Sequence, residues 1–168
     1  MVRLIVGVDE PLGQQNCGGC LYQNMVMSMR RVYFARAMDG IATDWIRGQA
    51  LEIEEILAAF GIQMLDPYRE ETEGETGESL GDRAREIVER DLALLRNSDA
   101  MLMDCSIAEH NYIGCICELV YAYLWKIPIV VFVGDTGNEK RIWLQYHASH
   151  VCKNRDEAIT KLIQILEN

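Results

Sequence analysis

Short apolar runs alternate with longer stretches of mixed polarity along most of this chain, and this alternation restricts its fold more than any other feature. The connections between successive runs are too long for hairpins, so neighbouring strands are expected to run parallel, with helices on both faces of the sheet. Five runs have the length and apolar content of strands buried in such a sheet: 32–35, 62–65, 100–104, 129–133 and 150–152.

Helical spacing of apolar residues marks the segments that connect these strands. Residues 41–60, 83–96 and 114–125 show it, and a capping box from Asn154 to Glu157 opens a last helix. Strand-to-strand crossovers in such proteins are right-handed. The sequence therefore predicts an α/β fold, a flavodoxin- or Rossmann-like three-layer sandwich with a five-stranded parallel sheet. Ligands of such sheets bind beyond the carboxyl ends of the strands.

Two regions depart from this regular pattern. Residues 1–30 contain many turn-forming residues and are interpreted as an N-terminal extension of uncertain order, whereas 31–168 are expected to form a single domain. Residues 69–82 hold five glutamates and three glycines without apolar periodicity, which predicts an exposed acidic loop.

Charge restricts the choice of partner. Lysine and arginine total 16 against 26 acidic residues, so the formal net charge is −10. Such a field repels a phosphate backbone and an anionic membrane, so neither nucleic acid nor a membrane is expected, and a small molecule remains open. No apolar run approaches the roughly 20 residues that span a bilayer. The start of the chain lacks the apolar region of a secretory signal, so a cytoplasmic location is expected.

Neither a metal nor a cofactor is expected. The CxxC formed by Cys17 and Cys20 lacks a second pair at zinc spacing, and the later cysteines near His110 do not supply one. Cys105 and Cys152 are interpreted as small core residues. The chain also lacks the phosphate loop GxxxxGK[ST], the nucleophile elbow G-x-S-x-G and the dinucleotide fingerprint GxGxxG.

Two carboxylates are candidates for chemistry. Glu118 lies one turn into a helix that follows the third strand, where the helix N-terminus favours its ionised form. The alternative is an acid that serves only the helix dipole. Asp91 shares a helical face with Ile87 and Leu94, and a carboxylate on an apolar face is costly unless it is paired or used. The alternative there is a surface acid at the edge of the apolar stripe.

Three segments, in order, resemble the nucleoside 2-deoxyribosyltransferase family and its relatives, the nucleoside 5′-monophosphate N-glycosidases. They are Arg31–Gly40 (RVYFARAMDG), Ile87–Asp104 (IVERDLALLRNSDAMLMD) and Gly114–Phe132 (GCICELVYAYLWKIPIVVF). The third is similar to the family's G-x-x-x-E-x-G-x-A-x-x-x-x-K-P stretch and is the most specific. The resemblance covers about residues 31–166 and implies that this part is a catalytic domain.

The resemblance implies cleavage or exchange of the N-glycosidic bond of (deoxy)nucleosides. Glu118 falls on the nucleophilic glutamate, Asp91 on the aspartate that handles the leaving base and its proton, and Tyr33 on the tyrosine that borders the sugar. Breaking this bond builds positive charge on the sugar, which a carboxylate can stabilise or attack to give a glycosyl-enzyme ester. The base is a poor leaving group unless a second acid protonates it.

Substrate-binding positions are also implied, and some depart from the family. Ala37 and Asp39 stand where phosphate-binding relatives have serine and arginine, and Val120 replaces a glycine. Tyr112 stands where those relatives have serine and the transferases often have an acid. These departures favour a nucleoside, and leave open a nucleoside 5′-monophosphate N-glycosidase and a non-catalytic nucleotide-binding module on the same fold. The expected substrate-binding residues are Arg36, Ala37, Asp39, Gly40, Asp104, Tyr112 and Gly114.

The resemblance finally implies an assembly. In the family, the last loop of one subunit often completes the site of a neighbour, and Arg141–His147 occupies that position here. Its aromatic residues suit a subunit interface. A homodimer or a higher homo-oligomer is therefore expected.

Overall fold

A five-stranded parallel sheet forms the centre of the computed structural model, which describes residues 29–70 and 80–168. The spatial order is β2-β1-β3-β4-β5, the doubly wound order of flavodoxin-like proteins. The predicted α/β sandwich is thereby confirmed. The strands are β1 (Arg30–Ala35), β2 (Ile62–Leu65), β3 (Ala100–Asp104), β4 (Ile129–Phe132) and β5 (His150–Cys152).

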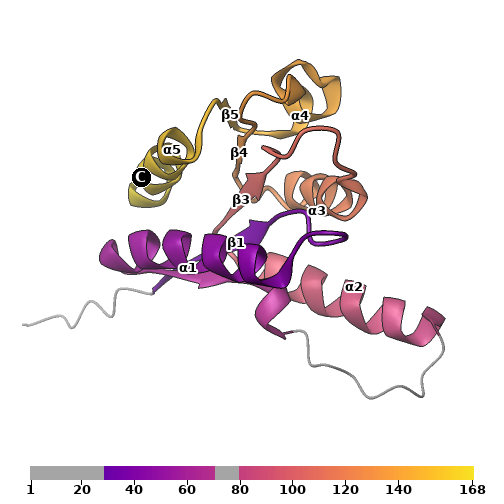
Figure 1. Cartoon of the computed structure of the whole chain (residues 1–168). Helices are drawn as coiled ribbons and strands as arrows, with labels where there is room; N and C mark the ends of the chain where they lie inside the picture. The colour runs from indigo at the N-terminus through magenta and orange to yellow at the C-terminus, as the bar shows by residue number, and fades with distance from the viewer. Residues whose placement is uncertain (1–28, 71–79) are drawn as a thin grey trace, which may run out of the picture.

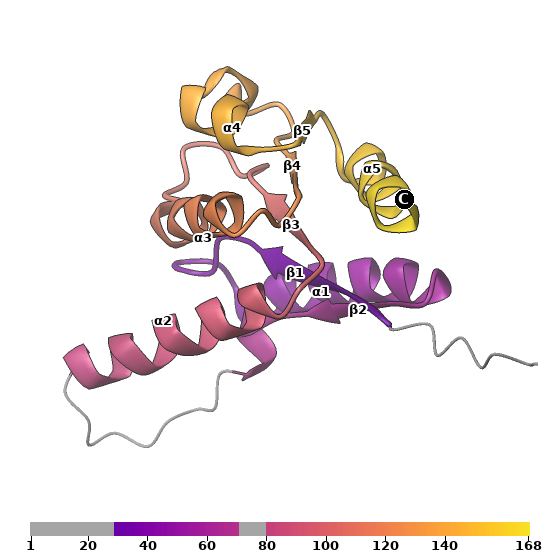
Figure 2. The ribbon, with the colours of Figure 1, turned by 180° about the vertical axis from the view of Figure 1, so that it is seen from behind.

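Helices cover both faces of this sheet (Figure 1; Figure 2 from behind). One apolar cluster packs α1 and α5 against the sheet, and a second packs α2, α3 and α4 against the opposite face. The three layers of the predicted sandwich are thus present. The helices are α1 (Thr43–Ala59), α2 (Leu80–Arg96), α3 (Ile113–Leu124), α4 (Ile142–His147) and α5 (Arg155–Glu167).

Strand alternation decides which side chains each layer receives. Successive residues of a strand point to opposite faces. In β1, Val32 and Phe34 pack toward α1 and α5, whereas Tyr33 and Ala35 pack toward α2 and α3. All four are buried, as expected for a strand covered on both faces. The face that carries Tyr33 is the one that bears the candidate site.

The structure differs from the sequence prediction mainly at element ends. Helix α2 begins at Leu80, three residues before the predicted start, so the predicted acidic loop is shorter at its carboxyl side. Between β4 and β5, where only a loop is predicted, a short 3-10 helix, η2 (Asn138–Lys140), precedes α4. Helix α4 has six residues, too few for apolar periodicity to reveal it.

Some predictions lie outside the described residues. The N-terminal extension up to residue 28, with its CxxC, is among them, and so is 71–79 of the acidic loop. The prediction that Cys105 and Cys152 are buried core residues is confirmed. No helix in the two described ranges is both long enough and apolar enough to cross a lipid bilayer.

Candidate active site

Tyr33 and Glu118 meet between the sheet and α3. Tyr33 is fully buried on β1, and its hydroxyl donates a hydrogen bond of 2.8 Å to Oε1 of Glu118. Glu118 lies in the second turn of α3 and is half-buried. The contact forms because strand alternation turns Tyr33 toward the face that α3 covers. It joins residues that are 85 positions apart in the sequence.

Asp91 approaches this pair from α2. Its apolar neighbours on the helix, Ile87 and Leu94, are half-buried, and Asp91 itself is only 7% exposed, so the predicted inward orientation is confirmed. Its negative charge raises the pKa of both Glu118 and Tyr33, which places the three groups within electrostatic range of one another. The structure thus brings together the three residues that the sequence assigned to chemistry.

Burial dominates the electrostatics of this cluster. It raises the pKa of Glu118 to about 7, with the Tyr33 hydrogen bond acting to lower that pKa and the charge of Asp91 acting to raise it. Burial, and then the charge of Glu118, raises the pKa of Tyr33 well above its usual range, so the phenol stays a neutral donor. Burial also raises the pKa of Asp91, against the Arg90 guanidinium.

Two carboxyl groups of this kind can divide acid and base roles between them. A glutamate that titrates near neutral pH supplies a carboxylate that can attack an electrophilic carbon or stabilise a cation. A second acid with a raised pKa can hold a proton for a leaving group. The cluster is therefore equipped for the displacement of a leaving group that requires protonation.

Arg36 is expected to bind substrate, but the structure pairs it with another residue. Its Nη1 and Nη2 donate hydrogen bonds of 2.8 and 3.0 Å to the two carboxylate oxygens of Asp66, and both side chains are almost completely buried. The guanidinium carbon lies 4.7 Å from the ring centroid of Phe34, which faces α1 and α5. Arg36 is therefore not brought together with Glu118. Sequence reasoning did not single out Asp66.

Asp104, a second expected substrate-binding residue, is also engaged elsewhere. It accepts hydrogen bonds of 2.5 Å from Nε2 of Gln49 on α1 and of 2.7 Å from the backbone N–H of Ser106. Its neighbour Leu102 packs in the cluster of α1 and α5, so alternation points Asp104 to that face as well. The carboxylate ties α1 to the loop after β3, on the opposite side of the sheet from Glu118.

Comparison with known proteins decides the family. The family model described as nucleoside 2-deoxyribosyltransferase matches residues 32–156, which include most of β1, all of α2 and α3, and the three clustered residues. The chain belongs to this family. The resemblance drawn from the three sequence segments is thereby confirmed.

Several solved structures share the fold of this chain. The 2-deoxyribosyltransferase of Bacillus psychrosaccharolyticus has 17% identity and a TM-score of 0.59, over 76% of this chain and 88% of that one. A conserved protein of Enterococcus faecalis V583 has 15% identity and a TM-score of 0.57, over 82% and 98%. The CMP N-glycosidase of Clostridium botulinum has 10% identity and a TM-score of 0.50, over 82% and 99%. At such identities the likeness shows the fold alone. A search among curated proteins gives no match.

The loop after β1 contains three of the expected substrate-binding residues, Ala37, Asp39 and Gly40. Ala37 is buried, whereas Asp39 and Gly40 are exposed. Gly40 has a φ of +73°, a left-handed conformation that glycine adopts without strain. Only the exposed part of this loop is open to a ligand.

Tyr112 and Gly114, at the start of α3, are two further expected substrate-binding residues. The Tyr112 hydroxyl accepts a hydrogen bond of 2.9 Å from the Ile107 N–H and donates one of 3.1 Å to the Ile107 carbonyl. The Tyr112 hydroxyl therefore holds the two ends of the loop before α3 together through both of its hydrogen bonds. Gly114, at the helix start, is exposed, and a β-carbon placed on it would meet nothing within 4 Å. The space above the first turn of α3 is consequently open.

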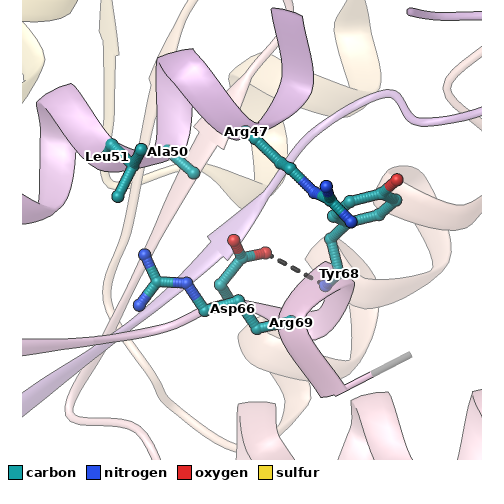
Figure 3. A pocket seen from close by; sticks show the side chains of 6 residues that line it. All are labelled: Arg47, Ala50, Leu51, Asp66, Tyr68 and Arg69. Carbon is teal, nitrogen blue, oxygen red and sulfur yellow. Dashed lines mark hydrogen bonds between the residues drawn. The ribbon is translucent and has the colours of Figure 1, made fainter. Parts of the chain in front are cut away.

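Two cavities of the described residues lie apart from this cluster. One of about 280 Å³ is lined by side chains from α1 and from the 3-10 helix that follows β2, η1 (Pro67–Glu70). In Figure 3 the Asp66 carboxylate points into it and accepts the Tyr68 N–H at 3.0 Å. A larger one, of about 530 Å³, lies between Tyr112 and Trp143. Neither of these two cavities is lined by Glu118.

The described residues offer no evident metal site. Within 29–70 and 80–168, no three His, Cys, Asp or Glu side chains gather closely enough to hold an ion.

Proposed function

We propose that this chain cleaves or exchanges the base of a (deoxy)nucleoside, with Glu118 as the nucleophile. The observation that carries the proposal is the hydrogen bond from buried Tyr33 to Glu118, with Asp91 in electrostatic range. Family membership supports it, as do structural neighbours whose names are 2-deoxyribosyltransferase and CMP N-glycosidase.

The proposed first step forms a glycosyl-enzyme ester. A carboxylate oxygen of Glu118 bonds to C1′ while the C1′–N bond breaks and leaves its electron pair on the base nitrogen. The Asp91 carboxyl gives its proton to the departing base, which leaves neutral. In the second step a nitrogen of another base, or a water oxygen, attacks C1′ and releases Glu118. The incoming proton returns to Asp91, and two inversions give net retention at C1′.

Tyr33 prepares the nucleophile in this scheme. Its hydrogen bond occupies Oε1 of Glu118 and leaves Oε2 to approach C1′. The bond also stabilises the carboxylate, which opposes the effect of burial on the Glu118 pKa. Because the Tyr33 pKa is raised far above neutrality, the phenol donates at every working pH.

A nucleoside is favoured over a nucleotide because the cation of the loop after β1 is already paired with an acid. Both terminal nitrogens of Arg36 donate hydrogen bonds to Asp66, and Ala37 is buried. A monophosphate N-glycosidase would prefer the 5′-phosphorylated substrate. In a competition assay with equal concentrations, we expect the nucleoside to be consumed at least as fast as its monophosphate.

We also propose that a second copy of the chain completes the site. Ile142, Trp143 and Tyr146 of α4 are 81%, 61% and 66% exposed, an apolar and aromatic surface of the kind that interfaces bury. The family resemblance of the sequence also implies that the segment containing α4 reaches a neighbouring subunit. The expected assembly is a homodimer or a higher homo-oligomer.

The deciding experiment incubates the protein with a panel of nucleosides and their monophosphates, with and without free adenine. Chromatography follows the released base and any new nucleoside. Wild type should release base, and mass spectrometry should find the pentosyl adduct on the peptide that contains Glu118. Glu118→Ala should be inactive, with an unchanged circular dichroism spectrum. Binding without turnover, at equal affinity in wild type and Glu118→Ala, would support the non-catalytic alternative instead.

A further inference from the structure

Arg90 holds the carboxylate of Asp91 by one oxygen only. Its Nε and Nη2 donate hydrogen bonds of 3.0 and 2.8 Å, and both end on Oδ1. Among the described residues, nothing donates a hydrogen bond to Oδ2. The side chains of Arg90 and Asp91 are 24% and 10% exposed, so the arginine side chain lies against the protein beside Asp91. Ordering a long charged side chain in this way has an entropic cost.

This geometry distinguishes the two oxygens of Asp91 chemically. Two N–H donors of one cation converge on Oδ1, and these charge-assisted hydrogen bonds stabilise negative charge on Oδ1 rather than on Oδ2. In the acid form Oδ1 is then the carbonyl oxygen that accepts both bonds, so the proton belongs on Oδ2. Oδ2 is therefore the oxygen that can exchange a proton with a ligand.

We propose that Arg90 is a positioning residue that fixes Oδ1 of Asp91 and thereby makes Oδ2 the oxygen that protonates the leaving base. The inference rests on the proposed function and adds to it a residue that the sequence did not single out. When the proton passes from Oδ2 to the base nitrogen, Asp91 becomes a carboxylate. The guanidinium, already in place, stabilises that charge and makes the buried acid a readier donor.

The charged groups around Asp91 indicate that Arg90 is the cation that stabilises its carboxylate. From β1 and α3 it faces Tyr33 and Glu118, which are neutral or negative. The 3-10 helix η1 also packs against α2, but the guanidinium of Arg69 there is paired with Glu54. Arg96, at the end of α2, lies over the Trp125 ring, 5.4 Å from its centroid. Arg90 is thus the cation that lowers the pKa of Asp91 against burial.

The proposal predicts a class of substrates whose cleavage does not require Arg90. A neutral base leaves as an anion unless it is protonated, whereas the base of an N7-methylated purine nucleoside already carries a positive charge and leaves neutral. The first class needs the proton from Oδ2, and the second does not. Loss of Arg90 should therefore slow base release only from nucleosides with a neutral base.

The test compares Arg90→Met and Arg90→Lys with wild type, using adenine and N7-methylguanine nucleosides. With the neutral base, Arg90→Met should lower kcat about 10- to 100-fold. It should also move the alkaline limb of the kcat–pH profile to higher pH, because Asp91 loses the cation that lowers its pKa. Arg90→Lys should keep the limb near its wild-type position. With the N7-methylated base, all three should react at rates within about threefold of one another.

Arg85→Met is the matched control, since Arg85 is an exposed arginine on the same helix. It should leave both rates and the pH profile unchanged. If Arg90→Met slows both substrates equally without moving the alkaline limb, Arg90 has only a structural role and the inference fails. If wild type releases base from neither substrate, the proposed function fails instead. Thermal unfolding of each variant shows whether the comparison is made on folded protein.

Discussion

The Tyr33 hydroxyl lies 2.8 Å from Oε1 of Glu118, so a fully buried strand residue contacts a carboxylate in the second turn of a helix. The contact joins β1 to α3 across the sheet face that α2 also covers. Burial raises the pKa of Glu118 to about 7, and this hydrogen bond acts in the opposite direction. The tyrosine thus increases the ionised fraction of the glutamate near neutral pH, against the larger effect of burial.

Tyr33→Phe should move the ionisation of Glu118 upward. Without the hydroxyl, the carboxylate loses its donor, so the Glu118 pKa should rise above about 7 and less nucleophile should be present at neutral pH. The acid limb of the kcat/KM–pH profile should shift to higher pH, and the rate at pH 6 should fall more than the rate at pH 9. The removal of one hydroxyl should cost only about 1 kcal/mol of stability. An unshifted acid limb would mean that another group controls it.

Glu118→Gln should stabilise the fold above neutral pH. Folding raises the pKa of Glu118 from 4.5 to about 7, so between these pH values the folded state binds more protons than the unfolded state. Stability therefore falls as pH rises through this window, because the charge is costly to bury. A glutamine keeps an oxygen for Tyr33 and carries no charge, so the gain at pH 8 should be about 2 kcal/mol. Urea unfolding at pH 5 and pH 8 should show the gain only at the higher pH.

The strands and most of the helices could be predicted because each is marked by a pattern in its own stretch of sequence. Strands covered on both faces, such as 100–104, read as unbroken apolar runs, and the helix that carries Asp91 shows its buried face by spacing. Spacing alone left Glu118 and Asp91 ambiguous, and Tyr33 entered through the family resemblance. The sequence thus located the cluster, and the hydrogen bond within it depends on tertiary packing.

Pairings between strand ends could not be predicted in the same way. Arg36 and Asp66 meet because β1 and β2 are neighbours, in a register that places Tyr33 opposite Leu65. Sheet order and register are set by the whole core, and neither is visible in the residues at the ends. A signal was nevertheless present, since a cation follows one strand and an acid the next. Read together, they would have suggested an ion pair rather than a ligand contact for Arg36.

Trp143→Ala combined with Tyr146→Ala should weaken self-association. Both side chains are exposed on α4, and their truncation removes aromatic surface that an interface would bury. Sedimentation velocity should show a larger monomer fraction than in wild type, and base release should fall with the oligomer. Trp45→Ala is a control on α1, since Trp45 is exposed on the opposite layer. A wild-type protein that remains monomeric at high concentration would contradict the proposed assembly.

Asp66→Ala should destabilise the fold by about 3 to 5 kcal/mol, since it leaves the Arg36 guanidinium buried without its partner. The double variant Arg36→Met with Asp66→Leu removes both charges and should recover most of that loss. Urea unfolding at pH 7 measures both. If Arg36 serves the fold in this way, the double variant should also retain base release and its preference between nucleoside and monophosphate. A selective loss of the monophosphate reaction in that variant would show that Arg36 contacts the phosphate after all.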